Sequence, residues 1–361
     1  MSKLFEPYDF CGIKLKNRFV RSATSENLTK NRLPTEQSFK LYKELARGEI
    51  GLIITSAMRP DRTWTRGPQQ KNMIIDSDDS IQKFKELTDL IHSFGSKVAL
   101  QLGSFFIYNG EPVAPSAIPY TWIPGVAPRA LTTEEIREIV KIYGIAGERA
   151  KKADFDAVQI HAAHGYPLSR FLSPRFNQRT DEYGGSPKNR ARIIIEIAAE
   201  IRKRTGSDFP VFVKMGVVDF CEGGLTKEDG VEVAKALSQN GISAIETSAG
   251  TPGSEMNALG AVNNSQWTEG YLLDYAAAIK AEVDENVPII LVGGLRDLSM
   301  MEDIISRGKA DLVAMSRPFI IEPHLIKRWK EDGDQEPSHC ISCNGCMDLY
   351  MDGETVECII E

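Results

Sequence analysis

The chain has 361 residues, a formal net charge of −7 and 42% hydrophobic residues, which is an ordinary composition for a globular protein. It contains no Lys/Arg-rich block and no apolar run near the ~18 residues of a membrane span, so the sequence argues against nucleic acid and membranes as partners. The first residues, MSKLFEPYDF, lack the apolar core of a signal peptide, and we therefore expect a cytoplasmic protein with reduced cysteines.

Short apolar segments recur along the chain, and most of them precede a stretch with helical periodicity. Because these segments are continuously apolar rather than alternating, they predict strands of a parallel sheet that is buried on both faces. The eight segments are Phe19–Ser22, Leu52–Thr55, Val98–Gln101, Ala157–His161, Val211–Lys214, Ala244–Ser248, Ile289–Val292 and Leu312–Met315.

Helical patterns fill most of the intervals between these strands. The segment Thr132–Ala153 begins with T-T-E-E, a hydroxyl cap followed by early carboxylates. Repeated βα units predict a (β/α)8 TIM barrel over residues 1–330, and the doubly wound alternative lacks a Gly-x-Gly-x-x-Gly after its first strand. The other expected helices are Ser80–Phe94, Asn189–Arg204, Thr226–Asn240 and Tyr271–Val283.

The C-terminal residues 331–361 form a cysteine-rich extension, which the polar stretch Glu331–Ser338 joins to the barrel. Three closely spaced thiolates and a fourth that returns later suit the corners of a [4Fe–4S] cubane, which would imply one-electron chemistry. Structural zinc, which more often takes two separate C-x2-C pairs, is one alternative, and four unligated thiols are another. The spacing is C-x2-C-x2-C-x11-C, formed by Cys340, Cys343, Cys346 and Cys358.

The functional site of a (β/α)8 barrel lies at the carboxyl ends of its strands. After the last two strands, Gly293, Gly294 and Ser316 would let backbone N–H groups approach an anion, and Arg317 adds a forked donor. A pair of glycines is by itself more often only a turn. Their combination with Ser-Arg after the next strand predicts a phosphate site.

His161, His164 and Tyr166 follow the fourth predicted strand. Two imidazoles three residues apart can donate to one carbonyl oxygen and so stabilise an enolate, and a tyrosine is a weak acid suited to proton donation. Metal-binding or merely packed histidines are the alternative, but no third ligand stands at metal spacing. Gln101 and Lys214 offer an amide and a charge that suit a flat heterocycle, although both could be ordinary polar residues of the barrel interior.

The stretch from residue 154 to residue 190, DFDAVQIHAAHGYPLSRFLSPRFNQRTDEYGGSPKNR, resembles the signature of the old yellow enzyme family. LFEP from Leu4, LKNR from Leu15, ALQL from Ala99 and DLVAMSRP from Asp311 agree with it in order and spacing, so the resemblance covers residues 4 to about 325. The tail CISCNGC is similar to the cluster-bearing branch of 2,4-dienoyl-CoA reductases and trimethylamine dehydrogenases, where such cysteines hold a [4Fe–4S] cluster beside FMN.

The resemblance implies FMN across the barrel mouth, with Ser25 near the N5/O4 edge of the flavin and Lys214 at N1/O2. His161 and His164 would bind the carbonyl oxygen of the substrate, and Tyr166 would protonate the α-carbon after hydride reaches the β-carbon. The residues expected to contact FMN are Ala23, Thr24, Ser25, Ala57, Gln101, Lys214, Gly293, Gly294, Ser316 and Arg317.

Several positions depart from the family pattern. Lys214 stands where members commonly have Arg, and Ala23 and Thr24 replace a common Pro-Met pair. The third strand continues into Gly-Ser-Phe rather than His-Ala-Gly, so the substrate range of the family cannot be transferred. Cluster-bearing relatives also continue into dinucleotide-binding domains, whereas this chain stops at Glu361. NAD(P)H would then reduce FMN directly, or a partner would deliver electrons to the cluster, or the cluster would only staple the tail.

The predicted function is therefore FMN-dependent reduction by NAD(P)H of C=C bonds activated by a carbonyl or thioester, in an enzyme that we expect to be a homo-oligomer. One alternative is an amine dehydrogenase of the trimethylamine dehydrogenase type, with an aromatic bowl from Trp64, Trp122 and Trp267. Another is an FMN/Fe–S electron-transfer subunit that serves a partner. A further alternative is a flavin-free barrel that binds phosphorylated substrates.

Overall fold

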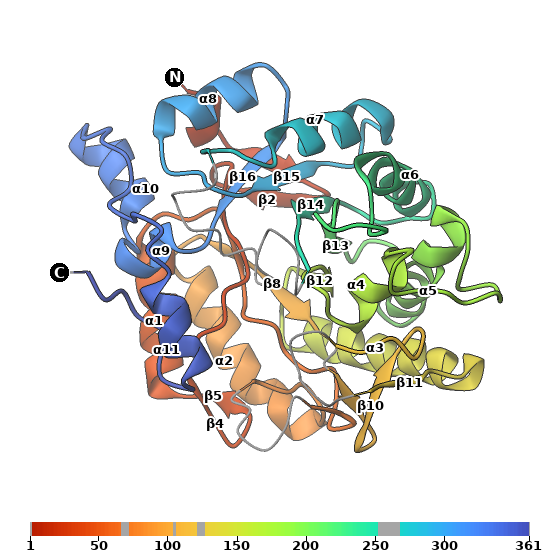
Figure 1. Ribbon diagram of the computed structural model, residues 1–361. Coiled ribbons are helices and arrows are strands. Elements are labelled where there is room, and N and C mark those ends of the chain that lie inside the picture. Colours follow the sequence, from red (N-terminus) through yellow and green to blue (C-terminus); the bar gives the residue numbers. More distant parts are fainter. Residues whose placement is uncertain (1, 66–71, 104–105, 121–126, 252–267, 361) are drawn as a thin grey trace.

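The computed structural model describes residues 2–65, 72–103, 106–120, 127–251 and 268–360. Its central feature is a closed barrel in which every neighbouring pair of strands is parallel (Figure 1). The predicted (β/α)8 barrel is thus confirmed, and each predicted apolar segment overlaps one barrel strand. The strands are β3 (Phe19–Arg21), β6 (Leu52–Ile54), β8 (Lys97–Leu102), β12 (Ala157–Ala162), β13 (Val211–Gly216), β14 (Ile245–Ser248), β15 (Ile289–Val292) and β16 (Leu312–Met315).

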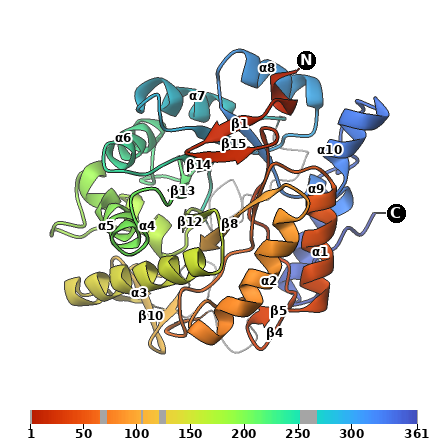
Figure 2. The ribbon, with the colours of Figure 1, turned by 180° about the vertical axis from the view of Figure 1, so that it is seen from behind.

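Helices surround the barrel, as the periodicity predicts (Figure 2). Thr132 caps α3 and does not belong to it, because its hydroxyl accepts from the backbone of Glu135 while the Glu135 carboxylate accepts from the backbone of Thr132. The predicted helices are confirmed within a few residues at each end. The outer helices are α1 (Glu36–Arg47), α2 (Ile81–His92), α3 (Thr133–Lys152), α5 (Pro187–Thr205), α6 (Lys227–Ser238), α7 (Leu273–Glu282) and α8 (Leu298–Ser306).

A hairpin of β1 (Tyr8–Phe10) and β2 (Ile13–Leu15) packs on the apolar residues that line the barrel interior. The Phe10 ring lies edge-on to Phe212 of β13, with centroids 5.6 Å apart. Because Phe212 is near the amino end of its strand, the hairpin closes that end of the barrel. The carboxyl ends of the strands are therefore the end left for a site.

Smaller elements lie in the loops of the carboxyl end. A four-stranded sheet and a short hairpin follow the early barrel strands, and α4 (Pro167–Leu172) follows β12. Among the described residues, no helix combines the length and the apolar character that crossing a bilayer requires. The loop strands are β4 (Thr29–Lys30), β5 (Leu33–Pro34), β7 (Trp64–Thr65), β9 (Ile107–Tyr108), β10 (Glu111–Ala114) and β11 (Arg129–Ala130).

The chain beyond the last strand returns to the barrel mouth. It forms α9 (Pro318–Ile321), α10 (Leu325–Lys327), the π-helical turn η3 (Arg328–Asp332) and α11 (Gly345–Met351). The Asn27 amide, which follows β3, donates to the carbonyl oxygens of Tyr350 and Glu354 at 3.3 and 2.8 Å. The Arg296 guanidinium donates to the Cys340 carbonyl at 3.0 Å. These bonds fix the tail against the loops after β3 and β15.

Candidate active site

Two adjoining hollows open at the carboxyl ends of the barrel strands. The sequence predicts thirteen site residues in the barrel, and the structure brings all of them to the walls of one hollow or both. The first hollow contains Gly293 and Gly294, whereas the second contains Gln101, His161 and Tyr166. The two hollows are neighbours, because their walls have six residues in common: Ala23, His164, Lys214, Ser316, Arg317 and Met347.

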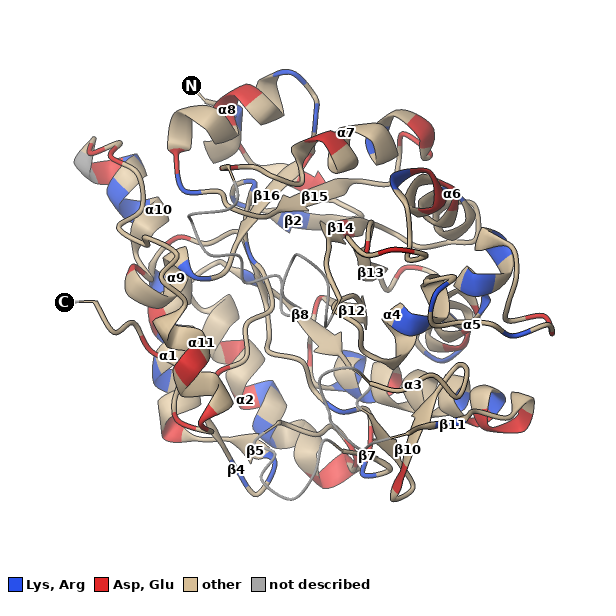
Figure 3. Ribbon diagram, viewed as in Figure 1, with Lys and Arg blue, Asp and Glu red and all other residues tan. Residues whose placement is uncertain are grey.

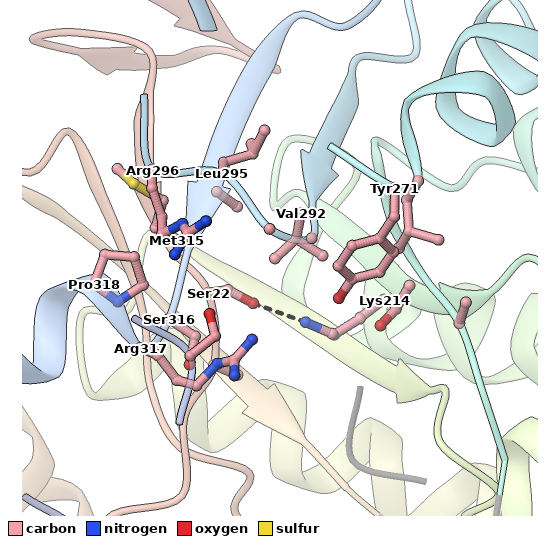
Figure 4. A pocket seen from close by; sticks show the side chains of 18 of the residues that line it. Ser22, Lys214, Tyr271, Val292, Leu295, Arg296, Met315, Ser316, Arg317 and Pro318 are labelled. Atoms are coloured by element: carbon pink, nitrogen blue, oxygen red, sulfur yellow. Dashed lines mark hydrogen bonds between the residues drawn. The ribbon is translucent and has the colours of Figure 1, made fainter. Parts of the chain in front are cut away.

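The first hollow has the features of an anion site. Gly293 and Gly294 have φ values of 128° and 67°, which L side chains rarely adopt, and a Cβ on Gly294 would lie 3.1 Å from the Tyr271 ring. Figure 4 shows Ser316 and Arg317 on one side of the hollow and Tyr271 on the other. The Ser316 hydroxyl is 2.7 Å from that of Thr24. Small residues with open backbone beside a guanidinium fit the phosphate of FMN.

A buried polar network lies beneath the junction of the two hollows. Neighbouring strands align Lys214 of β13 with Glu246 of β14, and the Lys214 ammonium lies 2.8 Å from the Glu246 carboxylate and 2.7 Å from the Ser22 hydroxyl. The other Glu246 oxygen accepts from Gln159 at 2.6 Å, and the Gln159 carbonyl accepts from Gln101 at 2.7 Å. Each of these side chains is buried. The network therefore fixes both Lys214 and Gln101 at the floor of the site.

The two histidines are held as neutral bases. Burial, together with the nearby Lys214 charge, lowers the pKa of His161 to about 3. Burial and the neighbouring His161 and Lys214 also lower the pKa of His164 well below its usual value. The His164 Nε2 atom lies 2.7 Å from the Ser248 hydroxyl, whereas the buried His161 Nδ1 atom has no hydrogen-bond partner. A neutral imidazole has one N–H to donate, so His161 can donate it to a ligand oxygen, and His164 can donate from Nδ1 when the Ser248 hydroxyl donates to its Nε2 atom.

The turn after β12 brings Tyr166 back beside His161. His164 and Gly165 adopt left-handed φ values of 65° and 73°, which reverses the chain before α4. The Tyr166 ring stacks on Phe106 with a 5.0 Å centroid separation, and its centroid is 5.1 Å from that of His161. The phenol is thus placed beside the histidines by packing and by the turn together.

The four cysteines of the tail line a third, smaller hollow. All four are free thiols; Cys343 is exposed and Cys346 is buried. Within the described part of the chain, no group of three or more His, Cys, Asp or Glu side chains is arranged so that it could hold a metal ion. Arg317 and Ile320 line this hollow as well as the second one, so the cysteine site adjoins the site at the barrel mouth.

The sequence analysis missed several residues that line the site or support it from neighbouring strands and from the tail. Gln159 could have been found, because it is a polar residue between the apolar Val158 and Ile160 of β12, whereas Glu246 is followed by two more polar residues in β14 and does not stand out. The expected aromatic bowl is wrong for Trp64, which is buried against Tyr108 and lines neither hollow of the barrel mouth. Trp122 and Trp267 lie outside the described residues. Missed residues that line the second hollow are Asn72, Ile320, Met347, Tyr350 and Val356.

The fold and the site define a (β/α)8 barrel with a phosphate-type cradle beside a pocket of neutral histidines and a tyrosine. Residues 3–336 match the model of the NADH:flavin oxidoreductase / NADH oxidase family. The chain belongs to this family, as its resemblance to old yellow enzymes predicts. Membership supports FMN as the cofactor and NAD(P)H as the reductant.

Similar proteins include reductases and an amine dehydrogenase. The chain is 36% identical to an NADH oxidase of Thermoanaerobacter brockii and 34% identical to a cinnamate reductase of Clostridium sporogenes, over 95% and 99% of its own length. It spans only 53% and 57% of these two relatives. A 2-naphthoyl-CoA reductase and the histamine dehydrogenase of Rhizobium sp. 4-9 superpose with TM-scores of 0.89 and 0.87 at 25% identity. Both matches cover 99% of this chain, and 57% and 52% of the solved chains.

Proposed function

We propose that this protein is an FMN-dependent ene-reductase that uses NAD(P)H to reduce C=C bonds activated by a carbonyl or a thioester. The observation that carries the proposal is the convergence of His161, His164 and Tyr166 on one hollow whose described lining contains no Asp or Glu. Neutral donors without a nearby carboxylate favour an oxygen that gains negative charge during the reaction.

Bound FMN would supply the hydride at its N5 atom. His161 and His164 would each donate one hydrogen bond to the carbonyl oxygen of the substrate. These hydrogen bonds become stronger as the oxygen gains negative charge during the reaction. The Tyr166 hydroxyl would hold the proton that the α-carbon receives. Burial excludes water from these side chains, which strengthens each hydrogen bond and slows loss of the proton to solvent.

The remaining site residues would hold the cofactor. We assign the flavin ring to the wall formed by Ala23, Thr24, Ser25 and Ala57, with Gln101 and Lys214 at the polar end of the ring. The phosphate would lie among Gly293, Gly294, Ser316 and Arg317. This arrangement is supported by the left-handed glycines and by the two donors fixed in the floor network.

We further propose that the extension 331–361 holds a [4Fe–4S] cluster through Cys340, Cys343, Cys346 and Cys358, with zinc as the alternative occupant. The support is the common hollow, together with its position beside the flavin site. A cubane binds each cysteine at a separate iron corner and would supply one-electron transfer. Electrons from NAD(P)H could then leave through the tail, or a separate partner could deliver them there.

Amine oxidation is the second candidate function, because a histamine dehydrogenase is among the similar structures. A protonated amine requires a carboxylate or an aromatic cage. Around the two hollows of the barrel mouth, the described lining contains Lys214, Arg296 and Arg317 and no acidic side chain. The charge of the site therefore favours unsaturated carbonyl compounds over cationic amines.

The experiment that tests the proposal separates the two half-reactions by stopped-flow absorbance. Tyr166→Phe should slow reoxidation of the reduced flavin by cinnamaldehyde at least tenfold, within the 10²–10⁴-fold range of general acid catalysis. Reduction of the flavin by NAD(P)H should stay within about twofold. An equal loss in both half-reactions would remove Tyr166 as the proton donor, and reduction of the flavin by histamine but not by NAD(P)H would establish the second candidate.

A further inference from the structure

The tail carries an apolar surface that no described residue covers. Among the described residues, four large hydrophobic side chains are exposed, and three of them lie beyond residue 340. Ile341, Met351 and Ile359 are 56%, 66% and 58% exposed. Ile359 packs against Gly345 at the start of α11, and Met351 ends the helix about 10 Å away. We call the surface formed by these three residues and the exposed acids Asp348, Asp352, Glu354 and Glu357 the tail face.

The tail face carries only negative charges. All 43 Lys and Arg residues precede residue 331, whereas residues 331–361 contain nine of the 50 Asp and Glu residues. The barrel is therefore close to neutral, and the tail accounts for the negative charge of the chain. In Figure 3 the ribbon of α11 has red segments and no blue ones. The described structure gives Asp348, Asp352, Glu354 and Glu357 no ion pair, so their charges face outward uncompensated.

We propose that the tail face is the docking site of a one-electron redox protein that presents a basic rim around an apolar centre. Exposed acidic and exposed apolar side chains in one short segment complement such a partner in charge and in hydrophobicity. Electron-transfer contacts are among the smallest specific interfaces, below about 1,200 Å² in total, so a small surface suffices. The uncompensated charge would steer a basic partner and speed its association.

The tail face adjoins the four cysteines, so a partner bound there would lie next to the proposed cluster. Ile341 and Ile359 line the same hollow as the four cysteines, and Arg317 and Ile320 join that hollow to the site at the barrel mouth. This part of the inference rests on the proposed function. Each NAD(P)H gives up two electrons and becomes NAD(P)⁺ with release of one proton, so two partner molecules are reduced by one electron each.

A second copy of this chain fits the tail face less well. In a symmetric dimer through this surface, the acids of one copy would face the same acids of the other, and like charges at an interface are repulsive. A dimer interface formed by two tail faces would therefore need a bound cation between the acids, whereas an interface with a basic partner would not.

The test uses the complete chain with its bound cofactors and cytochrome c, a basic one-electron acceptor. The variant D348N/D352N/E354Q removes three charges from the tail face. The matched control D208N/E228Q/E285Q removes three exposed charges for which the described structure gives no ion pair. Glu228 belongs to α6, and Asp208 and Glu285 follow α5 and α7, helices that lie across the barrel from α11 in Figure 1. We measure NAD(P)H-driven reduction of cytochrome c at 10 and 150 mM salt, and binding of oxidised cytochrome c by calorimetry.

At 10 mM salt the tail variant should reduce cytochrome c about tenfold more slowly and bind it more weakly, while the control variant should match the unmodified protein. The difference should shrink at 150 mM salt, because charges are screened there within about 8 Å. Equal rates in the tail variant, or an equal loss in the control, would overturn the proposal. A change of oligomeric state in sedimentation would assign the tail face to a second copy instead.

The design keeps the failure of the docking proposal separate from failure of the proposed function. Bleaching of the flavin by NAD(P)H without any acceptor is recorded first, and its absence would reject the proposed function alone. Calorimetric binding of oxidised cytochrome c needs no electron transfer, so it reports docking even in a protein that NAD(P)H does not reduce.

Discussion

Replacement of Lys214 by methionine tests whether the polar floor of the barrel is a single charged unit. The Lys214 and Glu246 side chains are 6% and 0% exposed, and their charged atoms are 2.8 Å apart. In Lys214→Met the Glu246 carboxylate keeps its hydrogen bonds from Ser22 and Gln159 but loses its counter-charge. Leaving one partner of a buried ion pair without the other costs about 3–5 kcal/mol.

The cost can be converted into a change of melting temperature. Unfolding of 361 residues at roughly 2.1 cal/mol/K per residue has a known order of entropy, and dividing the 3–5 kcal/mol penalty by it gives a decrease in melting temperature of about 4–7 °C. Calorimetry of the FMN-free protein measures it without interference from weakened cofactor binding. The double variant Lys214→Met/Glu246→Gln should recover most of the loss, because no charge is then left buried.

Arg307→Met provides the matched control for this experiment. The ion pair of Arg307 with Asp303 is exposed, with side-chain exposures of 69% and 55%, and its loss should cost less than about 1 kcal/mol. A loss below about 1 °C in Lys214→Met, or strictly additive effects in the double variant, would refute the reasoning that the two residues act as one unit.

Two further predictions concern the histidines and the cysteines. Between pH 7.5 and 5, His161 should lower the free energy of unfolding of the FMN-free protein by about 2 kcal/mol. In the unfolded chain the side chain has its ordinary pKa near 6.5 and binds a proton over this range, whereas in the folded protein its pKa is about 3 and it stays neutral. His161→Asn should remove the His161 part of this slope from denaturant titrations and leave the part that comes from His164, whose pKa is also lowered; an unchanged slope would contradict the assignment. Cys343→Ala should abolish iron and sulfide in metal analysis but leave FMN bound in a one-to-one ratio, since Cys343 lines neither hollow of the barrel mouth; loss of both centres together would mean that the tail is needed to fold the flavin site.

The barrel could be predicted because its strands are buried on both faces. A run such as IILV in β15 or LVAM in β16 is apolar at successive positions, which is typical of parallel strands. Once the strands are known, the residues at their carboxyl ends follow, and these include most of the predicted site. The loop strands after β8 could not be predicted in this way, because they are two to four residues long and have no clear period.

The partners of the predicted residues could not be predicted from spacing. His164 is next to Ser248, 84 residues later, and Ser22 is next to Lys214, 192 residues later. Such contacts depend on which strands become neighbours around the barrel and on their register. Spacing alone could not show that Ser248 contacts one ring nitrogen of His164, which leaves the other ring nitrogen for a ligand oxygen.

Residues of the tail line the site at the barrel mouth together with residues of the barrel. Met347, Tyr350 and Val356 lie beyond residue 330, yet they line the same hollow as the predicted flavin and substrate residues of the barrel. The Arg317 guanidinium donates to the Asn344 side chain at 2.7 Å, between the second and third cysteines. A residue that we assign to the phosphate is thus hydrogen-bonded to the cysteine loop. Removal of residues 331–361 would take away part of the wall of the second hollow and would also remove the Asn344 side chain that holds the Arg317 guanidinium. Even a barrel that still folds should therefore bind FMN more weakly.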